Sequence, residues 1–296
     1  MVEKALFMTQ PKKILVTGAQ GLLGAEVTRC LSQDPSYRVK GTTHAELDLT
    51  SGKEVAMWIE KMHPDFVINC AALSNVDTCE KHPEETFKVN AEGVKNLCFP
   101  LEETGGKLIQ ISTDYVFDGR KRTPYIETDS VNPLNVYAES KVKAEDYVRK
   151  FLPESLSVRV QWLYGEHGKN FASQMIRNVT YKNISEPYHL IEDRVGTPND
   201  VKDIAQGIHV LLEKDIKGIV HLSCEGECSW VEFGKTIFVL NGIEDVSQYI
   251  HVFKEADAQR AAQRPPYSTL SSIRLQPDCF WKTSLQRTIL NLKKNI

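Results

Sequence analysis

The sequence predicts an α/β protein built on a Rossmann-type, doubly wound parallel sheet, with a smaller C-terminal substrate lobe. Two observations carry this prediction. Short apolar runs alternate with segments of helical spacing through the first half of the chain, a pattern typical of a parallel sheet covered by helices on both faces. A glycine-rich turn follows the first apolar run. The chain has 296 residues, of which 41% are hydrophobic, and this suffices for a large core.

The first unit, residues 13–24, has the pattern of a strand, a glycine turn and the start of a helix. Residues 14–16 form the apolar run, and residues 22–31 have helical spacing. Gly18 permits a tight turn, Gly21 lets the backbone approach a pyrophosphate, and Gly24 lets the helix pack closely on the strand. Free N–H groups at the helix start suit a phosphate. The unit therefore predicts a dinucleotide site that includes Gly18, Gln20, Gly21, Leu22 and Leu23.

The alternation continues to about residue 165 and then loosens. The predicted strands of the regular part are 37–41, 66–70, 107–111 and 156–160, and its predicted helices are 53–62, 84–103 and 137–151. Beyond it, 187–191 and 218–222 resemble strands, whereas 170–181, 200–214 and 230–240 resemble helices. We expect an NAD(P)-binding domain at 12–165 and a substrate-binding lobe at 166–296. This lobe should interleave partly with the main sheet and cover its carboxyl edge, where ligands bind in open α/β sheets.

A tyrosine and a lysine stand four residues apart on the predicted helix at 137–151. Tyr137 and Lys141 would point the same way, one turn apart. An ammonium group beside a phenol favours the phenolate, so we expect Lys141 to lower the pKa of Tyr137 from about 10. Tyr137 would then donate a proton to a carbonyl oxygen. Thr113, just after the strand at 107–111, could give that oxygen a second hydrogen bond.

Composition excludes several other classes of protein. The net charge is −3 and the pI is near 6.3, without the clustered Lys and Arg of a nucleic-acid-binding domain. No stretch approaches the roughly 20 apolar residues of a membrane span. Residues 1–11 lack the apolar core of a signal peptide and resemble a short polar extension. We therefore expect a cytoplasmic protein without nucleic-acid or membrane partners.

Seven cysteines, an odd number at irregular spacings, fit a reducing compartment. Cys224 and Cys228 form the one close pair in the sequence, and His221 alone makes no convincing third metal ligand. We interpret all seven as thiols without a catalytic role and predict no metal ligands.

The motifs resemble those of the extended short-chain dehydrogenases/reductases, and within that group the dTDP-4-dehydrorhamnose reductase family. The resemblance extends from Lys13 to about Leu270. It is carried by Thr17 to Gly24, Asn69-Cys-Ala-Ala72, Val76-Asp77, Val89-Asn90-Ala91, Ser112 to Phe117, Pro133 to Tyr137, Trp162-Leu-Tyr-Gly165, Gly168-Lys-Asn170-Phe171, Gly196-Thr-Pro198 and Arg264-Pro265.

This resemblance implies a reaction and a set of residue roles. A nicotinamide hydride would reduce C4 of dTDP-4-dehydro-L-rhamnose, the last step of dTDP-L-rhamnose synthesis. Tyr137 would be the general acid, Lys141 would also hold the nicotinamide ribose, and Thr113 would bind the substrate oxygen. Further cofactor contacts would come from Thr43, His44, Asp48, Leu49, Cys70, Ala71, Ala72 and Asn90. Substrate contacts would come from Ser74, Val76, Asp114, Tyr115, Trp162, Asn170, Phe171 and Arg264.

For several of these positions the sequence also allows a purely structural role. Asp48 could belong to a helix N-cap region, Asn90 could be an ordinary polar helix residue, and Trp162 could be a core residue. Arg264 suits a diphosphate, because a guanidinium fork binds such oxygens bidentately, but it would also fit a surface salt bridge. Asp193 and Arg194 precede Gly-Thr-Pro in a loop that could close over the substrate.

The cofactor preference rests on the end of the second strand. An acid that reads a ribose 2′-hydroxyl would stand about 20 residues past the glycines. The sequence there is Lys40-Gly-Thr-Thr-His44, with Glu46 slightly later. Since no acid occupies the expected place, we expect NADPH, or both cofactors, with NADH as the alternative. The sequence does not decide between a monomer and a homodimer, and it leaves a requirement for Mg²⁺ open.

Departures from the family pattern leave the sugar specificity open. Val160 and Gln161 replace the small or hydroxyl residues usual before Trp162, and Ala138 replaces a glycine often found after the tyrosine. Two alternatives therefore remain. One is a reductase or epimerase of another nucleotide-linked sugar. The other is a non-catalytic NADP-binding regulatory subunit resembling the β subunit of methionine adenosyltransferase, which shares the tyrosine and lysine pair.

Overall fold

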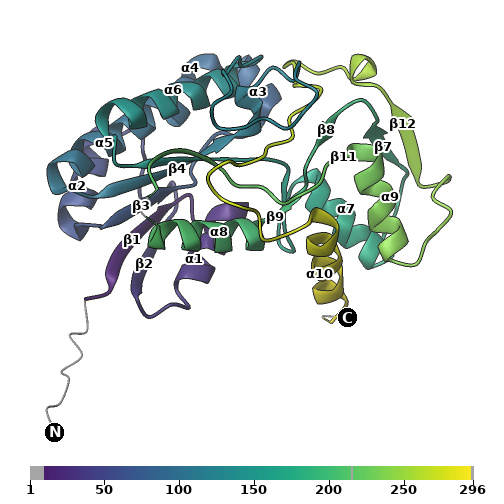
Figure 1. Cartoon of the computed structure of the whole chain (residues 1–296), viewed down its shortest axis with the longest axis horizontal. Coiled ribbons are helices and arrows are strands. Elements are labelled where there is room, and N and C mark those ends of the chain that lie inside the picture. The colour runs from purple at the N-terminus through teal and green to yellow at the C-terminus, as the bar shows by residue number, and fades with distance from the viewer. Residues whose placement is uncertain (1–9, 215, 295–296) are drawn as a thin grey trace, which may run out of the picture.

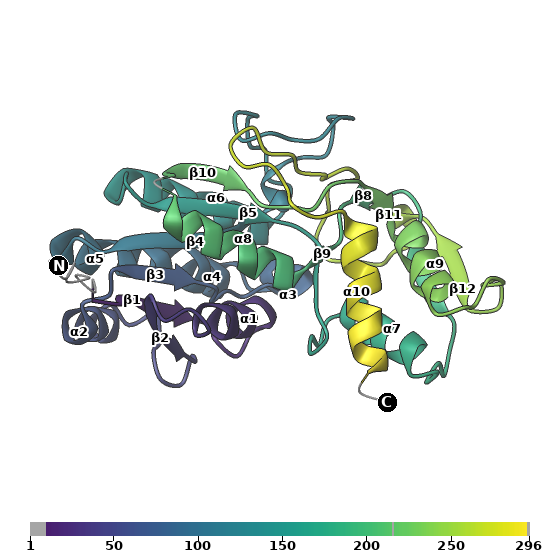
Figure 2. The same cartoon turned by 60° about the horizontal axis from the view of Figure 1, so that its bottom comes forward.

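The main body is a six-stranded, fully parallel sheet in the order β10-β5-β4-β3-β1-β2 (Figure 1; all six strands are labelled in Figure 2). The computed structural model describes residues 10–214 and 216–294. The strand order reverses between β1 and β3, and open α/β sheets bind ligands outside the carboxyl ends of the strands at such a point. The strands are β1 (Lys12–Thr17), β2 (Tyr37–Thr42), β3 (Phe66–Asn69), β4 (Lys107–Thr113), β5 (Leu156–Val160) and β10 (Gly218–His221).

Helices cover both faces of this sheet, as the alternating pattern predicted. One face packs against α1 (Leu22–Leu31) and α8 (Val201–Glu213), which contribute Val27 and Ile208 to the core. The other face packs against α2 (Gly52–Met62), α5 (Gly93–Thr104) and α6 (Val136–Phe151). Figure 1 shows these two layers on opposite sides of the strands. The Rossmann-type fold class is therefore confirmed.

A second lobe lies beyond the carboxyl edge of the sheet and has its own core (Figure 2). Its helices present apolar faces around Phe233 and Trp281, which are fully buried. The lobe comprises the helices α7 (Phe171–Thr180), α9 (Trp230–Leu240) and α10 (Trp281–Lys293), and the paired strands β7 (Tyr188–Ile191) with β12 (Ile250–Phe253), β8 (Val195–Gly196) with β11 (Cys228–Ser229), and β6 (Leu163–Tyr164) with β9 (Asn199–Asp200).

The segment after residue 165 contributes to both bodies. Strand β10 pairs with β5, and α8 packs against α1, so both join the main sheet layer rather than the lobe. The boundary between 12–165 and 166–296 stays a prediction. Strand 218–222, which the sequence placed in the looser part, forms the sixth strand of the main sheet.

The long helix predicted at 84–103 is wrong as a single helix. It is divided into α4 (Pro83–Phe87), a π-helical turn η1 (Lys88–Glu92) and α5, and α3 (Val76–Lys81) precedes it. Pro83 occupies the first turn of α4, where its missing N–H costs nothing. The π-helical turn is frequently found at functional sites. Two 3₁₀ turns, η2 (Asp114–Val116) and η3 (Glu255–Asp257), complete the described elements.

The interpretation of every cysteine as a thiol is wrong for one pair. Cys224 and Cys279 form a disulfide, with Cα atoms 4.9 Å apart across a separation of 55 residues. Backbone bonds between Glu225 and the segment that begins α10 bring the two together, a contact that no local spacing reveals. The sequence-near Cys228 stays free. Among the described residues, we find no helix with the length and apolar character needed to span a membrane.

Candidate active site

The glycine turn after β1 lies at the point where the strand order reverses. Gly18 has φ +66°, and a Cβ there would stand 2.7 Å from the backbone nitrogen of Ala71, which follows β3. A Cβ on Gly24 would overlap the carbonyl of Gly18. Helix α1 starts at Leu22 with Gly21 as its N-cap, without a side-chain cap or an acid in its first turn. The turn thus leaves N–H groups free for phosphate. The remaining predicted residues here are the exposed Gln20 and the buried Leu23.

Glu46 lies at the end of β2, although the distance from the glycines along the sequence did not predict an acid there. The turn after Thr43 brings the Glu46 carboxylate to the backbone N–H of Thr43, which donates to it at 2.9 Å. Lys40 pairs with the same carboxylate at 3.2 Å. His44 is exposed, with its ring 3.9 Å from Asp48. Because a short turn folds Glu46 back, counting residues from the glycines misplaced it.

Asp48 and Leu49 hold the chain between β2 and α2. The Asp48 carboxylate accepts hydrogen bonds from the N–H and hydroxyl groups of Thr50, at 2.8 and 2.9 Å. The Leu49 side chain is buried, and its carbonyl accepts a hydrogen bond from Asn96 at 2.8 Å. Both residues therefore have structural tasks, and their contact with an adenine stays a prediction.

A buried ladder of polar side chains fixes the carboxyl ends of β1, β3 and β4. The Asn69 oxygen accepts from the Thr17 hydroxyl at 2.6 Å and from the N–H of Ala71 at 3.2 Å. Its amide nitrogen donates to Gln110 at 2.7 Å. This positions Cys70, Ala71 and Ala72 beside Gly18, where the cofactor was expected to pass. Burial raises the pKa of the Cys70 thiol to about 12, so this residue stays uncharged.

Asn90 is buried in the π-helical turn η1 and joins two parts of the site. It accepts from the N–H of Leu73 at 2.8 Å, donates to the Leu73 carbonyl at 3.0 Å, and donates to the Ser140 hydroxyl at 3.1 Å. The loop after β3 is thereby fixed to α6 next to Lys141. Asn90 is thus more than an ordinary polar helix residue, because the π turn directs it into this junction.

Tyr137 and Thr113 come together at the carboxyl edge, and Lys141 follows Tyr137 by one turn of α6. Asn135 caps α6 by accepting from the N–H of Ala138 at 2.9 Å, and Tyr137 lies in the first turn. Burial raises the pKa of the Tyr137 phenol above its usual value, while a hydrogen bond with Thr113 acts in the opposite direction. The expected lowering of this pKa by Lys141 is therefore wrong here, because burial, which raises the pKa, outweighs the hydrogen bond with Thr113, and the nearby Asp114 charge raises it as well. Burial also lowers the pKa of Lys141, to about 8.

Asp114 and Tyr115, two predicted substrate contacts, follow Thr113 in the 3₁₀ turn η2. The Thr113 hydroxyl donates to Asp114 at 3.0 Å and accepts from the N–H of Tyr115 at 3.2 Å. Burial raises the pKa of Asp114 to about 6. The Tyr115 ring meets the Tyr137 ring edge to face, with centroids 6.3 Å apart. This edge of the sheet therefore gathers one hydroxyl, one buried carboxyl and two phenols.

Aromatic side chains gather within the lobe. Trp162 stacks on Trp230, with centroids 4.4 Å apart, and a Cβ on Gly196 would strike its indole ring. Phe171 meets Trp230 edge to face and is 47% exposed, so it is available to a ligand. Asn170 caps α7 by accepting from the N–H of Ser173 at 2.9 Å, and it donates to the Leu163 carbonyl at 2.7 Å. Asn170 and Phe171 open α7, as predicted.

Arg264 and Asp77 form a bidentate ion pair across the site. The two guanidinium nitrogens of Arg264 donate to the Asp77 carboxylate at 2.9 and 2.5 Å. This holds the pKa of Asp77 well below its usual range. Asp77 also accepts from the N–H groups of Ala261 and Ala262. Val76 starts α3 and Ser74 lies exposed before it. The diphosphate role of Arg264 stays a prediction.

Two residues outside the predicted site complete it. Trp230 supplies the partner of Trp162, and only the fold brings them together. Arg194 is buried, donates to the Tyr115 hydroxyl at 2.5 Å and lies 3.7 Å from Glu255. Among the described residues, four buried polar atoms of this region lack a hydrogen-bond partner, although buried polar atoms are normally hydrogen-bonded. They are Asp114 Oδ2, Trp162 Nε1, Arg194 Nε and Glu255 Oε2.

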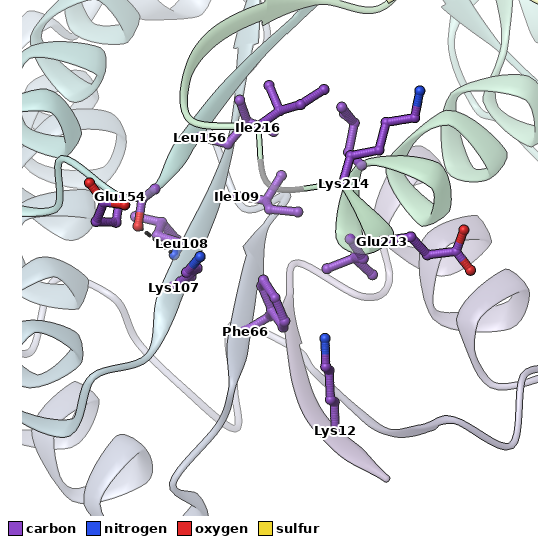
Figure 3. A pocket seen from close by; sticks show the side chains of 13 residues that line it. Lys12, Phe66, Lys107, Leu108, Ile109, Glu154, Leu156, Glu213, Lys214 and Ile216 are labelled. Atoms are coloured by element: carbon purple, nitrogen blue, oxygen red, sulfur yellow. Dashed lines mark hydrogen bonds between the residues drawn. The ribbon is translucent and has the colours of Figure 1, made fainter. Parts of the chain in front are cut away.

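Two other features of the described residues lie outside this site. A cavity of about 170 Å³ opens at the amino ends of the strands, the opposite edge of the sheet, between Lys12, Phe66 and Lys214 (Figure 3). His209 lies 2.9 Å from Asp34 and close to Glu213, a group with the donor atoms of a metal site. We assign neither a ligand nor a metal to these two places.

The fold and the edge-of-sheet site define a Rossmann-fold oxidoreductase of the short-chain dehydrogenase/reductase class. The family model described as the RmlD substrate binding domain matches residues 12–293. A dTDP-4-dehydrorhamnose reductase of Aggregatibacter actinomycetemcomitans is 32% identical over 273 residues, which covers 89% of this chain and 92% of the relative. The chain belongs to the dTDP-4-dehydrorhamnose reductase family.

Solved structures agree with this assignment. The dTDP-4-dehydrorhamnose reductase of Clostridium acetobutylicum has a TM-score of 0.88 and 36% identity, covering 95% of this chain and 99% of its own. The enzyme of the same name from Bacillus anthracis, solved in complex with NADP, has a TM-score of 0.88 and 30% identity, covering 95% of this chain and 100% of its own.

Proposed function

We propose that this protein reduces the C4 keto group of dTDP-4-dehydro-L-rhamnose to dTDP-L-rhamnose with NADPH. The observation that carries the proposal is the hydrogen bond between Thr113 and Tyr137 after β4, with Lys141 one turn further along α6 and close to Cys70, which borders the Gly18 turn. Family membership supplies the substrate class. A carbonyl reduction needs a hydride, a proton and an oriented carbonyl, and the site offers groups for the last two.

The nicotinamide cofactor supplies the hydride when it is bound. The chain fits such a group, because a Cβ at Gly18 or Gly24 would fill the turn and α1 starts with free N–H groups. We expect Tyr137 to hold the carbonyl oxygen of the sugar, joined by Thr113 when the Thr113 hydroxyl turns from Asp114 to that oxygen. Tyr137 keeps its proton at neutral pH, since burial raises its pKa, and gives it to the oxygen as negative charge develops.

NADPH is the proposed cofactor, with NADH as a second substrate for the same site. The NADP complex of the Bacillus anthracis enzyme supports NADPH. At the end of β2, the charge of Glu46 is paired with Lys40, so the carboxylate need not repel a 2′-phosphate. The same carboxylate could accept a ribose 2′-hydroxyl, which favours use of both cofactors. The structure offers no argument for Mg²⁺, and the oligomeric state and cytoplasmic location stay predictions.

The substrate would lie between the carboxyl edge of the main sheet, around Asp114 and Tyr115, and the aromatic side chains of the lobe. Sugar hydroxyls can satisfy the unpartnered atoms around Asp114 and Arg194, and the Trp162 and Phe171 faces suit a sugar or a base. The unusual Gln161 accepts from the N–H of Thr197 at 3.2 Å and donates to Ser223 at 2.9 Å. Its amide is thus occupied by the protein, which removes one reason to expect a different sugar.

An epimerase and a regulatory subunit would each differ from a reductase in how they use this site. An epimerase keeps its cofactor through turnover, whereas a reductase must exchange it, so the exchange of bound cofactor separates these two activities. A regulatory subunit would not need the Trp162 and Phe171 side chains, of which Phe171 is exposed. These aromatic side chains therefore favour a catalytic role.

The test is oxidation of NADPH by the purified protein with enzymatically generated dTDP-4-dehydro-L-rhamnose, with the product identified by mass and retention time. We expect stoichiometric conversion to dTDP-L-rhamnose. Tyr137→Phe should lower kcat by roughly 10²-fold or more while leaving NADPH affinity nearly unchanged, because only the proton donor is removed. A variant with the parent's kcat would contradict the role of Tyr137. Tight NADPH binding without oxidation would favour a different nucleotide-linked sugar or a regulatory role.

A further inference from the structure

Two side chains hold the first turn of α6 on either side of Tyr137. The N–H of Val136 donates to the Glu80 carboxylate at 3.0 Å, and the N–H of Ala138 donates to the Asn135 side-chain oxygen at 2.9 Å. The first N–H groups of a helix have no partner within the helix, so such bonds fix where the helix begins. Tyr137 is therefore carried by a turn in which both neighbouring peptide groups are held in place.

The Asn135 side chain also reaches a distant part of the chain. Its amide nitrogen donates to the Gln263 carbonyl at 2.8 Å, across a separation of 128 residues. Asn135 is 2% exposed, and a buried amide needs partners for both its oxygen and its nitrogen. Here these two partners belong to different segments. Asn135 thus joins the start of α6 to the residue that precedes Arg264.

Helix α3 connects the same two segments a second time. Asp77 and Glu80 stand three residues apart on α3, so they lie on one side of this helix. Glu80 binds the N–H of Val136, at the start of α6. Asp77 pairs with Arg264 and also accepts from two backbone N–H groups of the segment 261–264. This segment and the first turn of α6 are therefore joined directly through Asn135 and indirectly through α3.

We propose that Asn135 is a positioning residue of the reductase, whose side chain holds Tyr137 in a fixed place relative to the segment 261–264. It acts through the backbone of α6, because its oxygen binds the N–H of the residue after Tyr137. The inference rests on the proposed function, in which Tyr137 gives the proton and Arg264 binds the diphosphate. Two groups that act on different parts of one substrate must keep their separation, since a displacement of about 1 Å can lower a rate roughly 10²-fold.

The test is the steady-state kinetics of Asn135→Ser with NADPH and enzymatically generated dTDP-4-dehydro-L-rhamnose. Serine caps a helix as well as asparagine does, so α6 should still form, but its single hydroxyl cannot also reach Gln263. We expect kcat to fall about tenfold and the KM for the sugar nucleotide to rise severalfold, with the NADPH affinity unchanged in titration calorimetry. The ratio of kcat in H₂O to kcat in D₂O should also rise, because a displaced Tyr137 transfers its proton more slowly.

Two further variants keep the test decisive if Asn135→Ser is poorly folded. Asn135→Asp keeps the capping oxygen and loses only the N–H donor to Gln263, and Glu80→Ala releases the N–H of Val136. Both should lower kcat and raise the isotope ratio in the same way. Ser51→Asp, which alters the N-cap of α2, is the matched control and should behave as the parent.

Denaturant unfolding shows which variants are folded. The parent's kcat and isotope ratio in folded Asn135→Ser and Asn135→Asp would overturn the inference. A fall in kcat that only matches a loss of folded protein, with an unchanged isotope ratio, would overturn it as well. A parent protein that oxidises no NADPH with this sugar nucleotide would contradict the proposed function instead.

Discussion

At the scale of single residues, the site combines groups whose charge states are set by burial more than by their neighbours. Tyr137 was expected to be the residue with a lowered pKa, but burial raises it, and the lowered pKa belongs to Lys141. Sequence spacing correctly placed the two side chains on one helix face. It could not give the balance between desolvation and charge, because that balance depends on how completely the fold encloses each group.

The buried carboxyl of Asp114 gives a pH prediction at this scale. Because burial raises its pKa to about 6, the folded protein keeps a proton that the unfolded chain loses near pH 4. The contribution of Asp114 to stability is therefore fully present below about pH 4 and is lost as the pH rises through 6. Asn has no such proton to lose, so Asp114→Asn should gain about 2–3 kcal/mol relative to the parent between pH 4 and 7.5.

Denaturant unfolding of both proteins at a series of pH values measures this difference. The exposed Asp278→Asn serves as the control, with no comparable change expected. A difference between Asp114→Asn and the parent that stays constant with pH would show that Asp114 has the same pKa in the folded and unfolded states.

At the scale of elements, local sequence placed the strands and most helices of the main sheet correctly, because each carries its own apolar period. It failed where a helix changes type. The π-helical turn Lys88–Glu92 interrupts the helix predicted at 84–103 and directs Asn90 to Leu73 and Ser140. Helix α10 was not predicted, since its apolar face packs on a lobe that forms only from distant segments.

The segment 254–264 gives a prediction at this scale, since it crosses from the lobe to the main sheet. The Glu255 N–H donates to Asp193 at one end, and Arg264 pairs with Asp77 at the other. If Arg264 also binds the diphosphate, Arg264→Ala should raise the KM for the sugar nucleotide severalfold with little change in kcat. Asp77→Asn, which frees the guanidinium, should leave that KM unchanged or lower it.

Steady-state kinetics of the two variants distinguish a role of Arg264 in binding the substrate from a role in holding the segment 254–264 in place. Equal rises in KM for Arg264→Ala and Asp77→Asn would show that the ion pair only ties the segment in place. An unchanged KM in Arg264→Ala would remove Arg264 from the substrate site.

At the scale of the whole molecule, the fold class, the family and the glycine turn could be predicted from the sequence, because short-range motifs encode them. Contacts between residues that lie far apart in the sequence could not be predicted from it. Trp230 against Trp162, Arg194 against Tyr115 and the Cys224–Cys279 disulfide all join segments that only the folded chain brings together. The position of Glu46 at the end of β2 was missed for the same reason over a shorter distance, because a turn brings its carboxylate back to the N–H of Thr43.

The central claim is that the edge formed by Thr113, Tyr137 and Lys141 directs a hydride to the C4 keto carbon of a dTDP-linked sugar. The most direct measurement supplies NADPH deuterated at the transferable position and analyses the sugar nucleotide by mass spectrometry. We predict one deuterium per product molecule, located at C4 of the dTDP-L-rhamnose formed. A product without deuterium, or a sugar nucleotide that remains unchanged while NADPH stays bound and unoxidised, would contradict the account.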